Sequence, residues 1–354
     1  MSSEEKVRIN VFGSSHSDEI GVCIEGIRFG EKIDAEELQN FVNRRKPFGD
    51  FSTARRESDV LIFESGIENG VTTGGEIIIK MKNENARPKD YSELRYCPRP
   101  SHADYPAFMK YGEGYDASSG GKFSARMTAP MGAAGGVALQ ILRRKGISVG
   151  GYVQAIGGIS GASYRNTTVD EQAVLTAGQS SFPLLDGRYE AAMMREIEGA
   201  KSSGDSVGGV IECCVFGVPA GSGEPLRGSI ESEISRNVFA IPAVKGIEFG
   251  NGFALSAMRG SGANDEYYFD GNGRVKTSTN HNGGVLGGLA TGMPITFRVA
   301  FKPAASISKE QKTVNLKTGE DTYITVKGRH DSCFVPRAVP VVESMAALAI
   351  INYV

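Results

Sequence analysis

Tryptophan is absent from this chain of 354 residues, and histidine occurs only four times. The five cysteines are an odd number and lack the paired C-x-x-C spacing of a zinc site, so we expect reduced thiols and no metal ion. The sequence does not begin with the basic and then apolar segments of a secretory signal. Together these absences favour a cytoplasmic location.

Long hydrophobic runs are missing as well. Even residues 345–351 form a stretch much shorter than the ~20 residues needed to cross a bilayer. An excess of charge of one sign is also lacking, because the formal net charge is only -2. We therefore expect neither a membrane nor a nucleic acid as partner, and any affinity for anions must come from local clusters of Arg and Lys.

Two common nucleotide-binding patterns are absent. The glycine loop at residues 119–128 lacks the G-x-x-x-x-G-K-[ST] order of a P-loop. No G-x-G-x-x-G joins a strand to a helix with an acidic residue about twenty positions further on. Ordinary nucleotide hydrolysis and nicotinamide dehydrogenation both lose support.

Glycine, in contrast, is abundant, with 46 residues that punctuate short apolar runs. Runs rich in Val, Ile and Phe predict strands at residues 7–12, 60–65, 76–81, 209–216 and 295–301. Helical spacing predicts helices at 35–45, with Asp34 as N-cap, and at 127–145, 229–239 and 340–352. The chain is expected to be one catalytic domain, residues 1–354, of the α+β class.

A weak internal sequence similarity, which we call the echo, relates residues 68–79 to residues 286–297; each segment is a glycine turn followed by a predicted strand. It suggests two similar halves, at about 7–85 and 205–305. Chance recurrence of Gly-Thr turns in a glycine-rich chain explains the echo about as well. The polar region at about 155–205 is predicted to form an inserted helical excursion.

Histidines lie in two loops of interest. His16 directly follows a predicted strand, and His102 lies in a loop punctuated by proline. A lone loop histidine is more often a surface or hydrogen-bonding residue than a catalyst, so the residues alone leave both readings open. His281 and His330 have no stronger claim.

Cationic residues gather near the same loops. Their guanidinium groups suit carboxylates and phosphates, because each makes paired charge-assisted hydrogen bonds to a planar anion. For any single arginine, a solvated charge is the better explanation, and only the collective pattern is informative. The cluster comprises Arg44, Arg45, Lys46, Arg55, Arg56, Arg99, Lys122, Arg126, Lys302, Arg329 and Arg337.

Many short motifs follow one another along nearly the whole chain. They are GSSH at 13–16, RRKP at 44–47, RRE at 55–57, GVTTG at 70–74, RPSHADY at 99–105, GGKFSAR at 120–126, GDSVG at 204–208, AVKGIE at 243–248, NHNGG at 280–284, KP at 302–303 and GRHD at 328–331. In this order they resemble the motifs of chorismate synthases. Many motifs in one order are far more specific than any single one.

The resemblance implies a β-α-β sandwich, with a helical layer between two mainly antiparallel sheets, and a homotetramer. It also implies a lyase of the shikimate pathway, which supplies aromatic amino acids. Such an enzyme removes phosphate from 5-enolpyruvylshikimate 3-phosphate by an anti-1,4-elimination that requires reduced FMN. The electron chemistry belongs to that cofactor, while the protein positions and polarises. Whether NADPH or a separate flavin reductase supplies the electrons is left open by the sequence.

Site residues follow from the resemblance position by position. His16 would donate a proton near the leaving phosphate, His102 would stand by the flavin, and Asp331 would help accept the C6 proton by way of flavin N5. The FMN positions would be Lys122, Phe123, Ser124, Pro242, Ala243, Gly287, Lys302, Pro303, Ala304, Ala305, Ser306 and Arg329. The substrate would be held by Arg45, Arg126, Arg329 and Arg337, and Arg45 would also bind NADP.

The chain departs from the family pattern beside His16, where Ser14 and Ser17 replace the usual Glu and Gly. A further arginine usual after the Arg-Arg-x-Pro segment has no clear counterpart in residues 48–52, and Lys122 and Phe123 replace a frequent Arg-Ser pair. Two other functions therefore stay open: a diverged flavin-binding relative with different chemistry, and a glycine-rich oligomeric scaffold that binds no flavin. We expect activity to survive, because the proton-handling residues and the substrate arginines remain.

Overall fold

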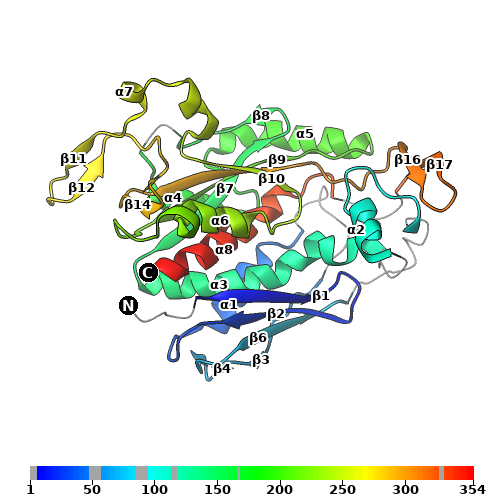
Figure 1. The fold of residues 1–354 in the computed structure, drawn as a ribbon, viewed down its shortest axis with the longest axis horizontal. Coiled ribbons are helices and arrows are strands. Elements are labelled where there is room, and N and C mark those ends of the chain that lie inside the picture. The colour runs from blue at the N-terminus through cyan, green and yellow to red at the C-terminus, as the bar shows by residue number, and fades with distance from the viewer. Residues whose placement is uncertain (1–5, 48–56, 85–94, 113–117, 166–167, 327–330) are drawn as a thin grey trace.

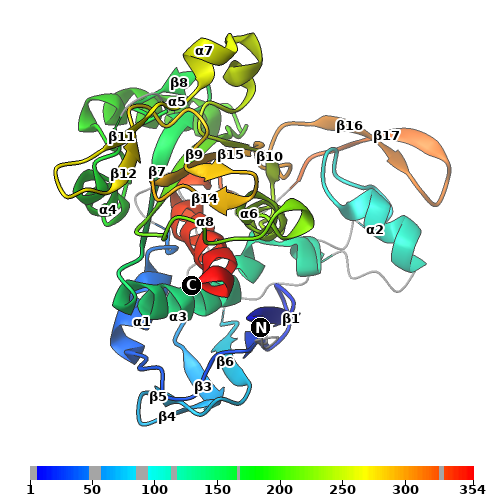
Figure 2. The ribbon, with the colours of Figure 1, turned by 60° about the vertical axis from the view of Figure 1, so that its left-hand side comes forward.

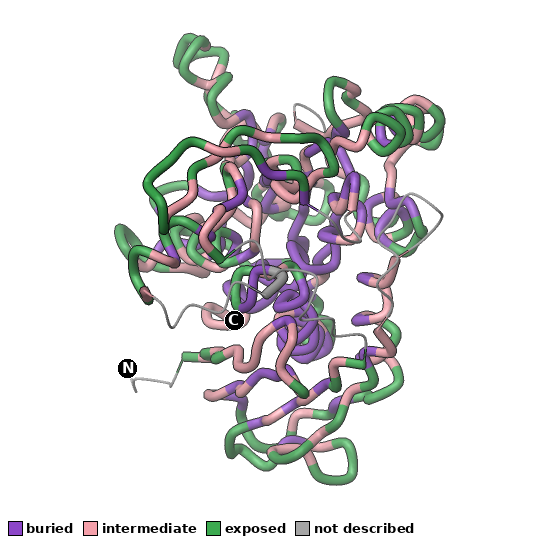
Figure 3. The backbone as a smooth tube through the Cα atoms, turned by 90° about the vertical axis from the view of Figure 1, so that its right-hand side faces the viewer, coloured by how far each residue is buried: buried purple, intermediate pink, exposed green. Residues whose placement is uncertain are grey.

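A computed structural model of the chain describes residues 6–47, 57–84, 95–112, 118–165, 168–326 and 331–354. Two antiparallel sheets enclose a layer of long helices (Figure 1). Buried residues concentrate in that helical layer and on the sheet faces turned toward it (Figure 3). The expected α+β sandwich is confirmed.

The first sheet has the strand order β1-β2-β6-β3. Its strands are β1 (Arg8–Gly13), β2 (Glu19–Glu25), β6 (Ile77–Lys82) and β3 (Ile62–Ser65). Alternate residues of β2, such as Ile20 and Ile24, are fully buried against the helices, while Cys23 and Glu25 point to the other face. A small hairpin of β4 (Ile67–Glu68) and β5 (Val71–Thr72) precedes β6.

The second sheet has the strand order β10-β15-β9-β7-β8. Its strands are β10 (Val244–Phe249), β15 (Ile295–Phe301), β9 (Gly209–Phe216), β7 (Ser148–Ile156) and β8 (Ile159–Ser160). Nearly all of β7 and β9 is buried. Helix α8 packs against both strands, and α4 and α5 pack against β7. A hairpin of β13 (Val285–Leu286) and β14 (Leu289–Ala290) precedes β15.

Four helices form the middle layer: α1 (Ala35–Asn43), α3 (Thr128–Arg144), α6 (Ile230–Val238) and α8 (Val335–Ile350). Helices α3 and α8 approach closely because Gly135 has no side chain. A Cβ at Gly135 would lie 2.1 Å from Cβ of Ser344. Asp34 caps α1 by accepting a hydrogen bond from the backbone N–H of Glu37 at 2.9 Å, as the sequence predicted.

The remaining elements lie around this core. They are α2 (Asp104–Tyr111), α4 (Glu171–Gly178), α5 (Glu190–Ser202), α7 (Gly260–Ala263), the β11 (Tyr267–Phe269) and β12 (Val275–Thr277) hairpin, and the β16 (Gln311–Asn315) and β17 (Glu320–Ile324) hairpin. The described residues also form short 3-10 helices: η3 (Ser118–Phe123), η4 (Ala125–Met127), η5 (Gly187–Tyr189), η6 (Leu226–Gly228), η7 (Gly252–Ala257) and η8 (Ile351–Tyr353). The turned view places α2 beside the β16–β17 hairpin (Figure 2). Backbone contact supports this, since the N–H of Leu316 donates to the carbonyl of Tyr96 at 2.8 Å.

The two sheets have similar connectivity, except that β8, α4 and α5 lie between β7 and β9 whereas β1 leads directly to β2. The sheet order β1-β2-β6-β3 corresponds to β7-β9-β15-β10. In each sheet a helix follows the second strand: α1 follows β2, and α6 follows β9. A hairpin of two-residue strands precedes β6 and β15, and a long helix, α3 or α8, comes later in the chain. The turn residues Asn69 and Gly70 match Gly287 and Gly288 in having positive φ. The halves suggested at about 7–85 and 205–305 stay a prediction, and we propose that any duplication has the wider bounds of about 8–144 and 148–350. Superposition of the two halves is its test.

Sequence patterns located β9 and β15 at their observed bounds, but they did not reveal β2, β7 or β10. The last helix begins at Val335 and not at Pro340, so that expectation was wrong. Pro336 occupies its first turn, where a missing N–H costs nothing. Pro340 lies inside, and its carbonyl accepts a hydrogen bond from the Ser344 hydroxyl at 2.7 Å.

Among the described residues, one helical segment, Val335–Tyr353, is long and apolar enough to cross a membrane. In the structure, 83% of its most apolar window is buried. It packs against α3, α6, β7 and β9. Its apolar character is therefore explained by its place at the centre of the fold.

Candidate active site

A cavity of about 180 Å³ lies where α3 and α8 begin and α1 ends. Three arginines line it: Arg45 just after α1, Arg126 in η4, and Arg337 in the first turn of α8. The N-termini of two long helices add partial positive charge there. The other lining residues are Lys46, Pro47, Glu57, Asp59, Ser124, Ala125, Thr128, Ile241, Pro242, Phe301, Asp331, Phe334, Ala338 and Val341.

Asp59 connects two of these arginines. Its carboxylate accepts a hydrogen bond from Arg126 and a longer one from Nη1 of Arg45 at 3.4 Å. Arg45 is further fixed by Thr128, whose hydroxyl oxygen accepts from Nη2 at 2.7 Å and from Nε at 3.2 Å. All four side chains are buried. The guanidinium groups are thus held in place before any ligand arrives.

Electrostatics reflect this crowding of cations. Burial lowers the pKa of Arg45 to about 9; Asp59 opposes the shift, while Arg337 and Arg126 add to it. Burial alone would raise the pKa of Asp59, but Arg45 and Arg126 lower it below its usual value. A bound anion would raise the pKa of Arg45, as Asp59 does, and so stabilise its protonated form.

Asp331 and Arg337 form the other side of the cavity. Nη1 of Arg337 donates to the Asp331 carboxylate at 2.6 Å, and Nε donates to the backbone carbonyl of Arg45 at 2.8 Å. Arg337 therefore holds Asp331 and also fixes the backbone that carries Arg45. Arg329 and His330, as well as Arg55 and Arg56, lie outside the described residues.

His102 belongs to a second cluster. Its Nδ1 lies 2.7 Å from the carboxylate of Asp104, which also accepts from Nε of Arg99 at 2.7 Å and Nη2 of Arg99 at 2.8 Å. Nη2 of Arg99 also lies 3.0 Å from Nδ1, but Nδ1 carries the proton if it donates to Asp104, which leaves Nε2 as the acceptor. A Cβ at Gly120 would lie 3.2 Å from Nε2, so the glycine loop passes directly over the imidazole.

Burial lowers the pKa of His102 below its usual value; the hydrogen bond to Asp104 opposes this, and Arg99 and Lys302 reinforce it. Burial alone would raise the pKa of Asp104, but its hydrogen bonds from Arg99 and His102 lower it strongly. His102 is therefore a neutral imidazole oriented by an ionised carboxylate.

Residues 302–306 join this cluster to the cavity. Nζ of Lys302 donates to the carbonyl of Ser101 at 2.7 Å, and its backbone N–H donates to the carbonyl of Ala243 at 3.0 Å. Nη1 of Arg99 donates to the Ser306 hydroxyl at 3.0 Å. Burial lowers the pKa of Lys302, with Lys245 adding to the effect. Ala304 accepts a hydrogen bond from Ser206 at its carbonyl.

His16 lies in the loop of residues 14–18 between β1 and β2, which we call the His16 loop. The backbone N–H of Ser15 donates to the carbonyl of Gly121 at 3.2 Å, so this loop contacts the glycine loop that covers His102. The hydroxyl of Ser17 accepts from the N–H of Ser14 at 2.9 Å and lies 2.6 Å from the carbonyl of Glu19. Ser17 thus closes the loop by its own hydrogen bonds, without a positive φ.

Backbone strain is concentrated here. Among the described residues, five non-glycine residues have positive φ, and three of them lie at or beside the site. Asp59 lines the cavity, Ser101 precedes His102, and Ala243 accepts from the backbone N–H of Lys302. Such conformations cost about 1–3 kcal/mol each and are found mostly where surrounding contacts impose them. The fold therefore maintains this geometry at a cost.

Three other residues expected to bind FMN, Lys122, Phe123 and Gly287, do not line the cavity. Lys122 and Phe123 are exposed on η3. Gly287 lies at the tip of the β13–β14 hairpin, whose Gly288 carbonyl accepts from the N–H of Ile230 at the start of α6. The cavity meets the opposite end of α6, through Ile241 and Pro242. The structure does not bring Gly287 to the cavity within one chain.

Several residues of the site were missed by sequence reasoning: Asp59, Asn83, Asp104 and Thr128. Asp104 offered a signal, since it stands two residues after His102 at the start of a helix. The other three show no distinctive pattern: Asp59 lies in the segment before β3, Asn83 follows β6, and Thr128 begins α3. Only their contacts with Arg45 and Arg126 identify them.

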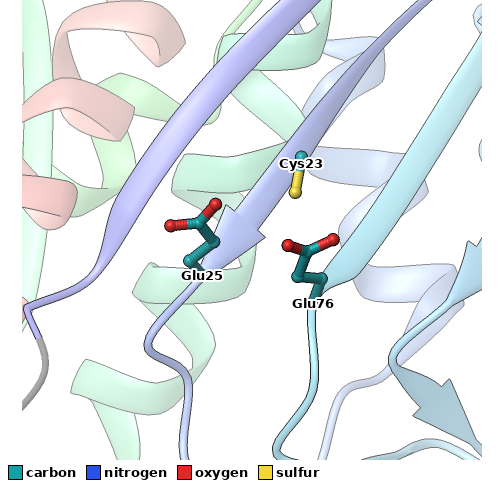
Figure 4. A group of neighbouring side chains, drawn as sticks. All are labelled: Cys23, Glu25 and Glu76. Atoms are coloured by element: carbon teal, nitrogen blue, oxygen red, sulfur yellow. The ribbon is translucent and has the colours of Figure 1, made fainter.

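Outside the cavity, Cys23, Glu25 and Glu76 lie together on the outer face of the first sheet (Figure 4). One possible ligand atom from each lies within 4.8 Å of the other two. Burial raises the pKa of Cys23, and Glu76 and Glu25 raise it further, so the thiol stays protonated. No other feature of the described residues points to a ligand there, and we assign the group no function.

Comparisons with known proteins agree with this geometry. Residues 7–354 match the family model described as "Chorismate synthase". The chain is 43% identical to chorismate synthase of Thermococcus gammatolerans over 97% of this chain and 94% of that protein. It is 42% identical to chorismate synthase of Lancefieldella parvula over 98% and 94%.

A solved crystal structure of a chorismate synthase has the same fold, with a TM-score of 0.75. It is 24% identical to this chain and is matched over 99% of this chain and 92% of its own. The family model, the curated relatives and the fold thus agree over essentially the whole sequence. The chain belongs to the chorismate synthase family.

Proposed function

We propose that the protein acts as a chorismate synthase that converts 5-enolpyruvylshikimate 3-phosphate to chorismate with the aid of reduced FMN. One observation carries the proposal: three arginines and two helix N-termini converge on one cavity beside the His102 cluster and the His16 loop. A substrate with a phosphate and two carboxylates requires such a concentration of donors. Phosphate loss completes a carbon–oxygen lyase reaction.

The residues present fit an anionic flavin. Gly120 leaves space over the His102 imidazole that a Cβ would narrow. Ser124 and Pro242 line the cavity, and the carbonyl of Ala243 accepts from the backbone N–H of Lys302. Lys302 and Lys122 supply cations suited to a phosphate group. Pro303, Ala304, Ala305 and Ser306 follow Lys302 along the chain, and Arg329 is a further candidate. Bound reduced FMN would supply transient electron density that promotes loss of phosphate.

The chain's own residues bind the substrate and move protons. Arg45, Arg126 and Arg337 hold the carboxylates and phosphate of the substrate, each already oriented by protein partners. His16 donates a proton to the departing phosphate. Asp331, positioned by Arg337, takes up the proton lost from C6. His102, oriented by Asp104, presents Nε2 toward the glycine loop.

Assembly and electron supply belong to the same proposal. We expect a homotetramer in the cytoplasm, and the position of Gly287 fits this: if it contacts FMN, it does so from a second copy. NADPH, bound in part by Arg45, or an external flavin reductase would keep the flavin reduced. Gel filtration with light scattering measures the assembly, and NADPH consumption by the purified protein separates the two electron sources.

The decisive experiment mixes purified protein, substrate and chemically reduced FMN without oxygen, and follows chorismate absorbance. Product that requires reduced flavin supports the proposal. Tight flavin binding without product indicates a diverged relative, and absence of both indicates a scaffold. In the same assay, Asp331→Ala and His16→Ala should keep FMN binding and lose most turnover. Wild-type kcat in either variant refutes the role assigned to that residue.

A further inference from the structure

The side chain of Asn83 lies between the His16 loop and the arginine cluster. Its Nδ2 donates to the backbone carbonyls of Ser17 at 2.6 Å and Ser14 at 3.1 Å. Its Oδ1 accepts a hydrogen bond from Nε of Arg126 at 2.8 Å. One amide therefore contacts both ends of the loop that carries His16 and the arginine expected to bind the substrate.

The sheet register places Asn83 at this point. Asn83 directly follows β6, and Lys82 pairs with Glu19 at the start of β2. The N–H of Asn83 continues the ladder by donating to the carbonyl of Asp18 at 2.9 Å. The residue after β6 must therefore lie beside the His16 loop, and its half-buried side chain is turned toward η4.

Arg126 has two further protein partners. Its Nη1 donates to the buried carboxylate of Asp59, and Nη2 lies 3.3 Å from the carbonyl of Lys82. Arg126 is thereby held from three sides, and of these contacts the one through Asn83 continues to the backbone of the His16 loop. A shift of Arg126 on binding an anion would therefore act on the His16 loop through this amide.

We propose that Asn83 is a positioning residue that couples substrate binding at Arg126 to the orientation of His16. It touches neither the substrate nor the cofactor and acts through these two residues. The inference rests on the roles proposed above for His16 and Arg126. It predicts that the donor and acceptor halves of the Asn83 amide have separable kinetic effects.

Two substitutions separate these halves. Asn83→Asp keeps an acceptor for Arg126 but places oxygen against the loop carbonyls, so kcat should fall about 10- to 100-fold while KM changes much less. The pH profile of kcat should also shift, because the loop that carries His16 moves. Asn83→Ala removes both halves, so KM should rise as well, by about fivefold, the value of one lost hydrogen bond.

Asn352 provides a matched control at the far end of α8. Its Oδ1 accepts from the N–H of Val7 at 2.8 Å, and its Nδ2 donates to the carbonyl of Leu348 at 3.2 Å. Asn352→Asp repeats the chemical change away from the cavity and should leave kcat and its pH profile unaltered. Thermal unfolding of every variant shows whether it is folded, and if Asn83→Asp is not, Asn83→Ala carries the test.

The outcomes are distinct. If Asn83→Asp and Asn352→Asp show the same kcat, KM and pH profile, Asn83 is merely structural and the inference fails. If His16→Ala and Arg126→Ala both keep wild-type kinetics, the roles assigned to those residues fail instead. Loss of turnover in these two variants with a wild-type pH profile in Asn83→Asp overturns only the coupling.

Discussion

Nδ1 of His102 lies 2.7 Å from the carboxylate of Asp104, two residues further along the chain at the start of α2. The same carboxylate is paired with Arg99, so it is ionised and already partly neutralised. Asp104 therefore fixes the ring orientation and the tautomer of His102 without making the imidazole strongly basic. This arrangement suits the neutral imidazole that we propose stands by the flavin.

Replacing Asp104 tests this relationship. Asp104→Asn should lower the pKa of His102 further, because the hydrogen bond that raises it is weakened while burial and Arg99 still lower it. Turnover should fall roughly tenfold or more. NMR titration of the His102 ring protons measures the shift. A rise in that pKa would contradict the role of Asp104 in stabilising the protonated form of the ring.

The pH dependence of stability should carry the signature of Asp104. Its folded pKa lies below the unfolded value, so its stabilising contribution is present above about pH 4 and is lost as the pH falls through the folded pKa. Wild type and Asp104→Asn should therefore differ most at neutral pH and converge in acid. Urea unfolding between pH 2 and 7 provides the comparison, and a constant difference would contradict the assignment.

Asp59→Asn should destabilise the protein by about 3 kcal/mol, because it leaves buried Arg45 and Arg126 without their common counter-ion. Phosphate should raise the melting temperature of this variant more than that of wild type, since an anion replaces the lost charge. The exposed pair of Lys312 and Asp321, 3.1 Å apart, provides the control. Asp321→Asn should cost less than about 0.5 kcal/mol. Equal costs in the two variants would remove the argument for a preassembled anion site.

Gly135→Ala should be among the most damaging single changes in the helical layer. The new Cβ would lie 2.3 Å from Cα of Ser344, which is backbone and moves only with α8 itself. We expect a loss of about 3 kcal/mol or more. Gly199→Ala in α5 is the matched control, because no atom lies within 4 Å of its added Cβ, and it should gain up to about 1 kcal/mol. Calorimetry distinguishes them, and similar melting temperatures would mean that α3 and α8 separate easily.

By itself, the sequence determined the family and part of the local structure. Its motif order identified the family, its apolar runs located β9 and β15, and Asp34 marked the start of α1. These features depend on residue type and short-range spacing, which a sequence displays directly. Strands such as β2 and β7 escaped because glycine and polar residues interrupt their apolar pattern, although both are mostly buried.

Tertiary structure alone decided which side chains meet. Asp59 reaches Arg45 and Arg126, and Asn83 joins Arg126 to the His16 loop, through contacts between segments 14 to 69 residues apart. Gly287, which the family resemblance assigned to FMN binding, lies at the end of α6 away from the cavity. Such distances are set by sheet register and by helix packing, which arise from the whole chain. Short-range sequence patterns do not encode them.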